Sequence, residues 1–213
     1  MRKAIALLSG GIDSAAALWW AKRKWRVYAL TFKFGNLNSN EVRSARQLAT
    51  FAKVSRHIIV DLKFLKQISE LSGREKVGGR ARRRFPPTYI PSRNTVFFGI
   101  ASYYAEIYGA NYVVTGHIGR DPFPDSKPEY IKAMNAALSR GSWLGKRYRT
   151  KIITPFAHAN KSDITRLAVR LKVPLALTWS CHWNRKTPCG RCEGCINRSS
   201  AFKSLKLRDT CRG

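Results

Sequence analysis

Acidic side chains are scarce in this chain. Its 213 residues include 12 Asp and Glu but 40 Lys and Arg, which gives a formal net charge of +28. So large a positive excess attracts polyanions and makes RNA or DNA a candidate partner or substrate. A diffuse positive surface tuned to an unusual cell interior would give the same total, because net charge bears on association and solubility rather than on a specific activity. Composition leaves both interpretations open.

Long apolar runs are also missing. No stretch approaches the roughly 20 apolar residues of a membrane-spanning helix, and the N-terminal Met-Arg-Lys-Ala leads into a strand-like segment rather than a cleavable signal. We therefore expect a cytoplasmic protein. At 213 residues the chain has the length of one large domain, or of one domain with a small appendage.

Two common nucleotide-binding signatures are absent. The first Gly-rich segment has neither the Gly-Lys-Ser/Thr end of a Walker P-loop nor the Gly-x-Gly-x-x-Gly spacing of a dinucleotide fold. Residues 9–14 instead read Ser-Gly-Gly-Ile-Asp-Ser, between a strand-like run at 4–8 and a helix-like run at 15–22. Adjacent glycines permit positive φ and close approach to a phosphate, while serine hydroxyls and helix-start amides supply donors. The segment resembles the PP-loop of ATP pyrophosphatases, which transfer AMP from ATP to a substrate oxygen; an ordinary Gly-rich turn is the alternative.

Short β-rich runs alternate with helix-like runs, which predicts an α/β fold with a parallel sheet flanked by helices. Strands are expected at 3–9, 27–34, 57–61, 111–116 and 151–154. Helices are expected at 12–24, 40–53, 94–108, 128–139 and 161–171. We divide the chain into an ATP-binding domain at 1–160 and a C-terminal helical segment with a metal site at 161–213.

Gly, Pro and Arg interrupt this pattern between residues 71 and 91, where we expect an exposed loop. Its Arg-Ala-Arg-Arg-Arg run at 80–84 is a candidate for binding RNA phosphates or a ligand anion. A solvated charge run is the commoner meaning of such a pattern.

Cysteine is rare outside one cluster. Of five cysteines, four lie within a short span, at Cys181, Cys189, Cys192 and Cys195, and Cys211 lies near the C-terminus. Four thiolates so close together favour one tetrahedral Zn²⁺, with no open position for water and therefore a structural role. An iron–sulfur cluster is an alternative, and disulfides are disfavoured in a reducing compartment. Cys211 is interpreted as a free thiol.

Three further motifs accompany the PP-loop. They are Thr-Tyr-Ile-Pro-Ser-Arg-Asn at 88–94, Pro-Asp-Ser-Lys-Pro-Glu-Tyr at 124–130 and the four-cysteine tail. In this combination the chain resembles the 7-cyano-7-deazaguanine synthase family of the PP-loop superfamily, from Ala4 to about Phe202. The resemblance implies a Rossmann-like fold of the adenine nucleotide alpha hydrolase type. It also implies conversion of 7-carboxy-7-deazaguanine, ammonia and ATP into the nitrile, through an adenylate and an amide, in queuosine or archaeosine biosynthesis.

The resemblance further implies Mg²⁺, a homodimer and a set of site residues. The ATP phosphates and adenine are expected at Leu8, Ser9, Gly10, Gly11, Asp13, Ser14, Leu30, Thr31, Phe32 and Gly116, with Asp13 also assisting Mg²⁺. The catalytic group is Asp13, Ser14, Arg93 and Lys161, and the substrate group is Tyr89, Arg93, Asp121 and Asp125. The Arg93 guanidinium matches phosphate oxygens in a fork, which suits charge stabilisation.

Some segments depart from the family pattern. Gly-Asn-Leu-Asn at 35–38 stands where the family has Gly-Gln-Arg-His, and Ser-Lys at 126–127 stands where it has Cys-Arg. The segment between Gly116 and Pro124 is also shorter. These segments lie where the base would be recognised. The acceptor stays open between the free deazapurine acid and a base within tRNA, and a nucleotide- or nucleic-acid-binding module without turnover is the third alternative.

Overall fold

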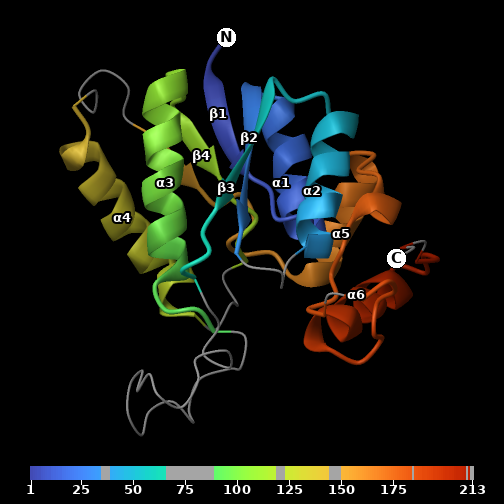
Figure 1. The fold of residues 1–213 in the computed structure, drawn as a ribbon. Helices are drawn as coiled ribbons and strands as arrows, with labels where there is room; N and C mark the ends of the chain where they lie inside the picture. The colour runs from blue at the N-terminus through green and yellow to red at the C-terminus, as the bar shows by residue number, and fades with distance from the viewer. Residues whose placement is uncertain are drawn as a thin grey trace, which may run out of the picture.

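The computed structural model describes residues 1–34, 39–65, 89–118, 123–143, 150–183, 185–209 and 211. The predicted α/β architecture is confirmed (Figure 1). Within these ranges, five strands, all parallel, form one sheet in the order β3-β2-β1-β4-β5. The strands are β1 (Lys3–Leu7), β2 (Arg26–Lys33), β3 (Arg56–Asp61), β4 (Tyr112–Val114) and β5 (Lys151–Ile153).

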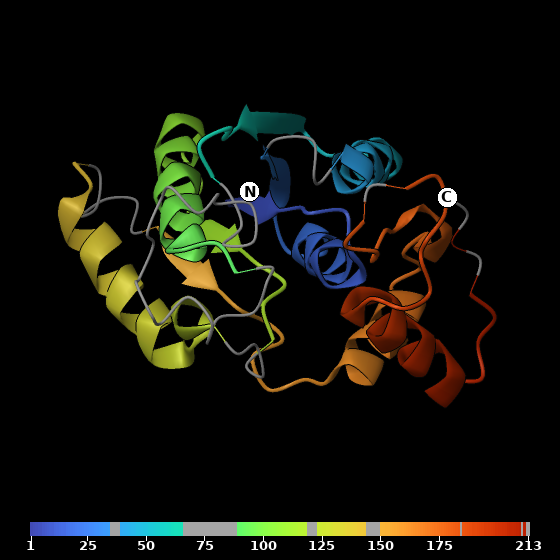
Figure 2. The ribbon, with the colours of Figure 1, turned by 60° about the horizontal axis from the view of Figure 1, so that its bottom comes forward.

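Helices cover both faces of the sheet (Figures 1 and 2). One face carries α1 (Ile12–Lys22), α2 (Ser39–Phe51), α5 (Lys161–Arg170) and α6 (Glu193–Ser204). The other carries α3 (Arg93–Tyr108) and α4 (Pro128–Gly141). Side chains of β1 alternate between the two cores, with Ala4 and Ala6 in the first and Ile5 and Leu7 in the second. Both faces are therefore apolar, as in parallel sheets generally.

The C-terminal segment packs directly on the first face. Ile164 and Ala168 of α5 and Phe202 of α6 belong to the same core cluster as Leu18 of α1. Buried Arg198 of α6 fixes this segment further, because its guanidinium makes a two-pronged ion pair with the carboxylate of Asp209 at 2.7 and 2.9 Å. The division of the chain at residue 160 stays a prediction.

Two short 3-10 helices complete the described fold, η3 (Pro124–Ser126) and η4 (Leu175–Leu177). None of the helices in the described ranges is long and apolar enough to cross a membrane.

Candidate nucleotide site and metal centre

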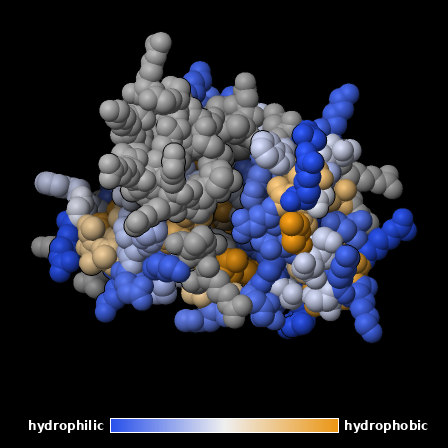
Figure 3. All heavy atoms as spheres, turned by 90° about the horizontal axis from the view of Figure 1, so that it is seen from below, coloured by the Kyte–Doolittle hydropathy of each residue, from blue (hydrophilic) through white to orange (hydrophobic). Residues whose placement is uncertain are grey.

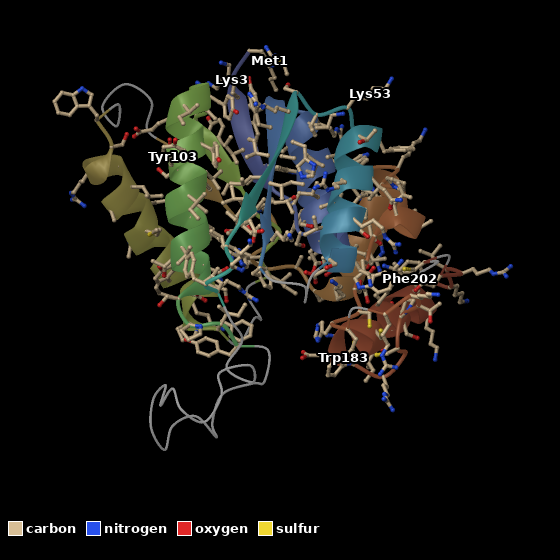
Figure 4. All side chains as sticks on the ribbon, in the orientation of Figure 1. Met1, Lys3, Lys53, Tyr103, Trp183 and Phe202 are labelled. Atoms are coloured by element: carbon tan, nitrogen blue, oxygen red, sulfur yellow. The ribbon has the colours of Figure 1, made fainter. Side chains whose placement is uncertain are left out.

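The carboxyl ends of β1 and β4 lie side by side in the middle of the sheet. In open α/β sheets, ligands bind outside the carboxyl ends of the strands, at the point where the strand order reverses. Figure 2 brings this end of the molecule forward, and Figure 3 shows the same end hollowed near its centre. The candidate site is the group of segments that meet there: the PP-loop (residues 9–14), the starts of α2, α3 and α5, and residues 115–118 after β4.

The PP-loop makes a tight turn that requires glycine at Gly10. Gly10 has φ +94°, and a Cβ there would lie 2.2 Å from the backbone oxygen of Glu41 in α2. The Ser14 hydroxyl closes the loop, because it accepts from the Ser9 amide at 3.2 Å and donates to the Gly11 carbonyl at 3.0 Å. The first amides of α1 have no partner within the helix and face the loop, which is the usual arrangement for binding an anion.

Gly116 lies against the start of α1. A Cβ at this position would come within 2.6 Å of the carbonyl carbon and oxygen of Asp13. Because only glycine allows this close approach, the chain leaving β4 passes directly beside the PP-loop. The prediction had placed Gly116 near the nucleotide, and the structure brings it next to Asp13.

Asp13 and Lys161 form an ion pair at this edge. Lys161 Nζ lies 2.5 Å from Asp13 Oδ2, and each side chain is about three-quarters buried, with exposed fractions of 26% and 25%. Lys161 is the first residue of α5, whose start is fixed by a capping box between Asn160 and Asp163. The other oxygen, Asp13 Oδ1, is buried and has no hydrogen-bond partner among the described residues. An orphaned carboxylate oxygen suits a magnesium ion, which takes oxygen ligands.

Arg93 begins α3 after Ser92, a residue in the left-handed region with φ 52°. Its guanidinium lies over the ring of Phe123, 5.4 Å from the ring centre. The same charge influences the pKa values of Glu41 and His117, so all three groups lie within electrostatic reach at the sheet edge.

A hydrogen-bonded chain holds the start of α3 beside β4. Asp125 accepts from the Asn94 amide at 2.8 Å and from Asn94 Nδ2 at 3.1 Å. Asn94 Oδ1 lies 3.2 Å from His117 Nε2, and His117 Nδ1 lies 2.7 Å from the Thr115 hydroxyl. Since Asn94 turns its NH₂ group to a carboxylate, His117 Nε2–H donates to Asn94, and His117 Nδ1 accepts from Thr115.

His117 is neutral in this network. Burial lowers its pKa to about 4, and the nearby Arg93 guanidinium lowers it further while Asp125 opposes the shift. The network therefore holds Asp125 beside the start of α3 without adding a positive charge. Asp125 was predicted to contact substrate; its carboxylate is engaged with Asn94, and the substrate role stays a prediction.

The residues predicted for adenine use their side chains for packing. Leu8 and Leu30 are buried, and the Leu8 amide donates to the Leu30 carbonyl at 2.8 Å. The Thr31 hydroxyl donates to the Leu8 carbonyl at 2.6 Å, and Phe32 stacks on Phe97 with ring centres 4.0 Å apart. Their side chains are thus committed to the sheet, which leaves backbone groups as the means of contact with a base.

The remaining predicted substrate residues are only partly covered. Tyr89 stacks on Phe123, with ring centres 5.8 Å apart. The Arg93 guanidinium lies over the same Phe123 ring. Asp121 lies outside the described residues, as do the arginine run at 80–84 and the altered segment at 35–38.

The four clustered cysteines come together as predicted. The sulfur atoms of Cys181, Cys189, Cys192 and Cys195 all lie within 4.8 Å of one another. The Cys189–Cys195 and Cys192–Cys181 sulfur pairs are each 4.0 Å apart, too far for a disulfide. Zn–S bonds of about 2.3 Å place tetrahedral ligands about 3.8 Å from one another, so the group fits a zinc site.

The surrounding backbone supports the same assignment. Amides donate to the sulfurs, among them Cys189 N to Cys181 Sγ at 3.4 Å and Cys192 N to Cys189 Sγ at 3.3 Å. Burial raises the pKa of Cys195 to about 12, so a metal ion has to displace its proton on binding. Cys211 is not part of the sulfur group, and its thiol donates to the Thr178 carbonyl at 3.2 Å.

Comparison with known proteins shows which family the chain belongs to. The profile of the family described as "Queuosine biosynthesis protein QueC" matches residues 3–206. The chain belongs to the QueC family. The family resemblance inferred from the motifs is thereby confirmed.

Among its QueC relatives, the chain is 38% identical over 216 residues to the 7-cyano-7-deazaguanine synthase of Thermoplasma volcanium, covering 98% of this chain and 89% of the relative. It is 37% identical over 210 residues to the 7-cyano-7-deazaguanine synthase of Aquifex aeolicus, covering 94% and 96%. These alignments span nearly the whole of each protein.

Solved structures show that the QueC fold is shared more widely. A predicted subunit of tRNA methyltransferase from Methanocaldococcus jannaschii superposes with a TM-score of 0.52 at 19% identity, covering 79% of this chain and 75% of that one. The U34-tRNA thiolase NcsA from Methanococcus maripaludis superposes with a TM-score of 0.51 at 15% identity, covering 96% and 65%. At such low identity these likenesses show the fold alone.

Three polar residues at the edge of this QueC sheet were missed as site residues: Glu41, Asn94 and His117. His117 follows the end of β4, which is a signal that the sequence carries, whereas Glu41 and Asn94 lie in the first turns of α2 and α3. Their mutual contacts depend on how the strands are ordered in space, and the sequence pattern does not give that order.

Proposed function

We propose that this chain is an ATP-dependent carbon–nitrogen ligase that converts 7-carboxy-7-deazaguanine and ammonia into 7-cyano-7-deazaguanine. The observation that carries the proposal is the match, over nearly the whole chain, to proteins named 7-cyano-7-deazaguanine synthase at 38% and 37% identity. The site geometry supports it, because a PP-loop, a lysine and an arginine meet at the edge where such sheets bind nucleotides.

The chemistry explains the need for ATP. A carboxylate oxygen is a poor leaving group, and its attack on the α-phosphate of ATP converts it into part of AMP, which leaves easily. Ammonia then forms the amide, and a second activation of the amide oxygen permits loss of that oxygen with AMP to give the nitrile. Side chains form no covalent bond in this scheme, so catalysis rests on positioning and on charge stabilisation.

The PP-loop and its neighbours are assigned to the triphosphate. The amides at the start of α1 donate to phosphate oxygens. The hydroxyls of Ser9 and Ser14 do so after turning away from the Ser14 oxygen and the Gly11 carbonyl to which they donate in this structure. Lys161 neutralises phosphate charge from the Asp13 side, where its ammonium already lies 2.5 Å from a carboxylate oxygen. Arg93 does so from α3 on the other face of the sheet.

Contacts between backbone groups and the adenine complete the proposed ATP site. Leu8, Leu30, Thr31 and Phe32 are assigned to the adenine through backbone groups, since their side chains pack in the sheet. Gly10, Gly11 and Gly116 keep the surrounding backbone free of Cβ atoms.

Two metal ions belong to the proposal. Asp13 would hold Mg²⁺ through its orphaned Oδ1, and the ion would supply charge neutralisation on the phosphates. The cysteine group would hold Zn²⁺, which supplies no open position and therefore stabilises the C-terminal segment.

The acceptor side is assigned to Tyr89, Arg93, Asp121 and Asp125. A carboxylate can accept from the N–H groups of a guanine-like edge, and Asp125 of η3 is bound to the amide of Asn94, the residue after Arg93. A homodimer, a cytoplasmic location and the division of the chain at residue 160 are also part of the proposal.

The proposal is tested with zinc-loaded protein, ATP, Mg²⁺ and 7-carboxy-7-deazaguanine. Release of pyrophosphate is expected only when the acid is present, and guanine serves as the matched control because it lacks the carboxylate. Acid-independent ATP hydrolysis, or no pyrophosphate at all, would remove the synthase assignment.

A base within tRNA is the second candidate acceptor, because the net charge of +28 favours a polyanion. It predicts AMP release that tRNA stimulates and that added salt suppresses steeply. Adding tRNA to the pyrophosphate assay distinguishes the two candidates, since the free acid should suffice under our first proposal.

A further inference from the structure

Glu41 is a partly buried carboxylate at the sheet edge that the roles above leave unused. It lies in the first turn of α2, and its backbone oxygen approaches the PP-loop so closely that a Cβ on Gly10 would lie 2.2 Å from it. Glu41 therefore borders the proposed phosphate site.

The Glu41 carboxyl also lies within electrostatic reach of Arg93, which is assigned to the acceptor side of the site. The charge that acts on its carboxyl is the guanidinium of Arg93, which comes from α3 on the opposite face of the sheet. From the PP-loop, the group packed against Glu41 is the uncharged backbone of Gly10. Glu41 thus lies beside the loop proposed for ATP and within electrostatic reach of the arginine proposed for the reacting carboxyl.

The Glu41 carboxylate is not engaged in a hydrogen bond within the described part of the chain. Neighbouring acids differ: Asp13 is paired with Lys161, and Asp125 accepts from Asn94. A carboxylate without a hydrogen bond or ion pair to these residues can exchange a proton with a bound ligand.

Burial raises the pKa of Glu41 to about 7, although the nearby Arg93 charge lowers it. Both protonation states are therefore populated near neutral pH. A general base works best when its pKa lies near the working pH.

Ammonia carries three protons and the nitrile nitrogen carries none, so nitrogen must lose three protons over the proposed reaction. When ammonia attacks the acyl adenylate, the C–N bond forms, the C–O bond to AMP breaks, and the new ammonium nitrogen sheds the first proton. When the amide oxygen attacks the second ATP, pyrophosphate leaves and the amide nitrogen sheds the second proton to give the imidate. The imidate then loses AMP from carbon and the last proton from nitrogen, and the C≡N bond forms. The roles assigned so far provide phosphate contacts for these steps but no acceptor for the protons.

We propose that Glu41 is the catalytic proton acceptor for nitrogen, first as ammonia becomes the amide and then as the imidate becomes the nitrile. This inference rests on the proposed synthase function. It adds a residue to the ammonia-dependent half of the reaction and leaves the adenylation half unchanged.

The test separates the two halves. Adenylation is followed without ammonium, as exchange of labelled pyrophosphate into ATP in the presence of the acid. Amide and nitrile formation are followed with ammonium by mass spectrometry. In Glu41→Gln we expect exchange within about threefold of the native rate, while amide formation falls by about 10²–10⁴-fold, the usual contribution of a general base.

The matched control is Glu193→Gln, the same change at an exposed position in the first turn of α6. It should leave both halves at native rates. Zinc content and melting temperature are compared for all variants, so that a folding defect is recognised.

Glu41→Asp keeps a carboxylate and separates chemistry from structure. In the native protein, log kcat for amide formation should rise with pH and level off near pH 7, because the ionised carboxylate is the base. Glu41→Asp should show the same kind of break in its pH profile at a lower rate. Glu41→Gln should show no such break. A merely structural Glu41 would change melting temperature without removing the break.

Amide formation by Glu41→Gln at the native rate, or a parallel loss of exchange and amide formation, would overturn the assignment of Glu41. Failure of the native protein to exchange pyrophosphate would instead contradict the proposed function itself, so the two failures are distinguishable.

Discussion

The ammonium group of Lys161 lies 2.5 Å from Asp13 Oδ2, although the two residues are 148 positions apart in the chain. This pair joins the start of α5 to the PP-loop. The C-terminal segment therefore contributes directly to the edge of the sheet where we place ATP, in addition to carrying the cysteine group.

Removing the Lys161 charge should impair ATP use. In Lys161→Met we expect kcat/KM for ATP to fall by about 10²-fold or more, as when a charge-stabilising donor is lost from an active site. The Asp13 carboxylate would also be left without its cation, so Mg²⁺ dependence should change. Initial-rate measurements over ATP and Mg²⁺ concentrations check this, with exposed Lys203→Met of α6 as the control. Equal kinetics in the two variants would contradict the role.

A methyl group at Gly10 should disrupt the PP-loop. Gly10→Ala places Cβ 2.2 Å from the Glu41 carbonyl oxygen at a φ of +94°, so we expect a lower melting temperature and loss of the thermal shift on adding ATP. Gly99→Ala is the matched control, because nothing lies within 4 Å of a Cβ in that helical position. Gly99→Ala should be neutral or stabilising by about 0.5–1 kcal/mol. Normal ATP binding by Gly10→Ala would refute the loop geometry.

The cysteine group should bind one zinc ion per chain. Elemental analysis of purified protein should show zinc, and Cys189→Ser should lose it while Cys211→Ser keeps it, because Cys211 lies outside the sulfur group. Chelation should unfold α6 and weaken the helical signal in far-ultraviolet circular dichroism. The free energy of Zn²⁺ binding at structural sites in small peptides is about 10–16 kcal/mol, and it is lost when the metal is removed. Iron with visible absorbance would instead identify an iron–sulfur cluster.

Stability should fall in mild acid because of two histidines. Burial lowers the pKa of His57 and of His117 from 6.5 to about 4. Each binds a proton more readily in the unfolded chain, so the free energy of unfolding should fall as pH drops from 6.5 towards 4. Urea unfolding across this range should show a shallower fall in His57→Gln and in His117→Gln than in the exposed His158→Gln. Identical slopes would contradict the burial of these rings.

Much of the fold could be predicted because its signals are local. Hydrophobic runs bounded by turn residues located the five strands of the described part of the chain, and observed ends differ by a few residues. The strand predicted to reach residue 9 ends at Leu7, because the chain turns there into the PP-loop. The cysteine spacing predicted the sulfur group directly, since ligands close in sequence need little of the tertiary fold.

Long-range relationships could not be predicted in this way. The α3 helix is apolar on most sides, so its sequence pattern does not single out Phe98, which is fully buried. The network through Asn94 and His117 depends on β4 lying beside β1, and the polar residues alone do not specify this. Glu41 was missed for the same reason: its proximity to Arg93 is set by two helices on opposite faces of the sheet.

The most direct test of the account is the product formed from ¹⁵N-ammonium, ATP and 7-carboxy-7-deazaguanine by the zinc-loaded protein. Mass spectrometry should show 7-cyano-7-deazaguanine carrying one ¹⁵N atom, preceded by the labelled amide. Folded, metal-loaded protein that binds ATP but yields neither labelled compound would contradict the proposed reaction.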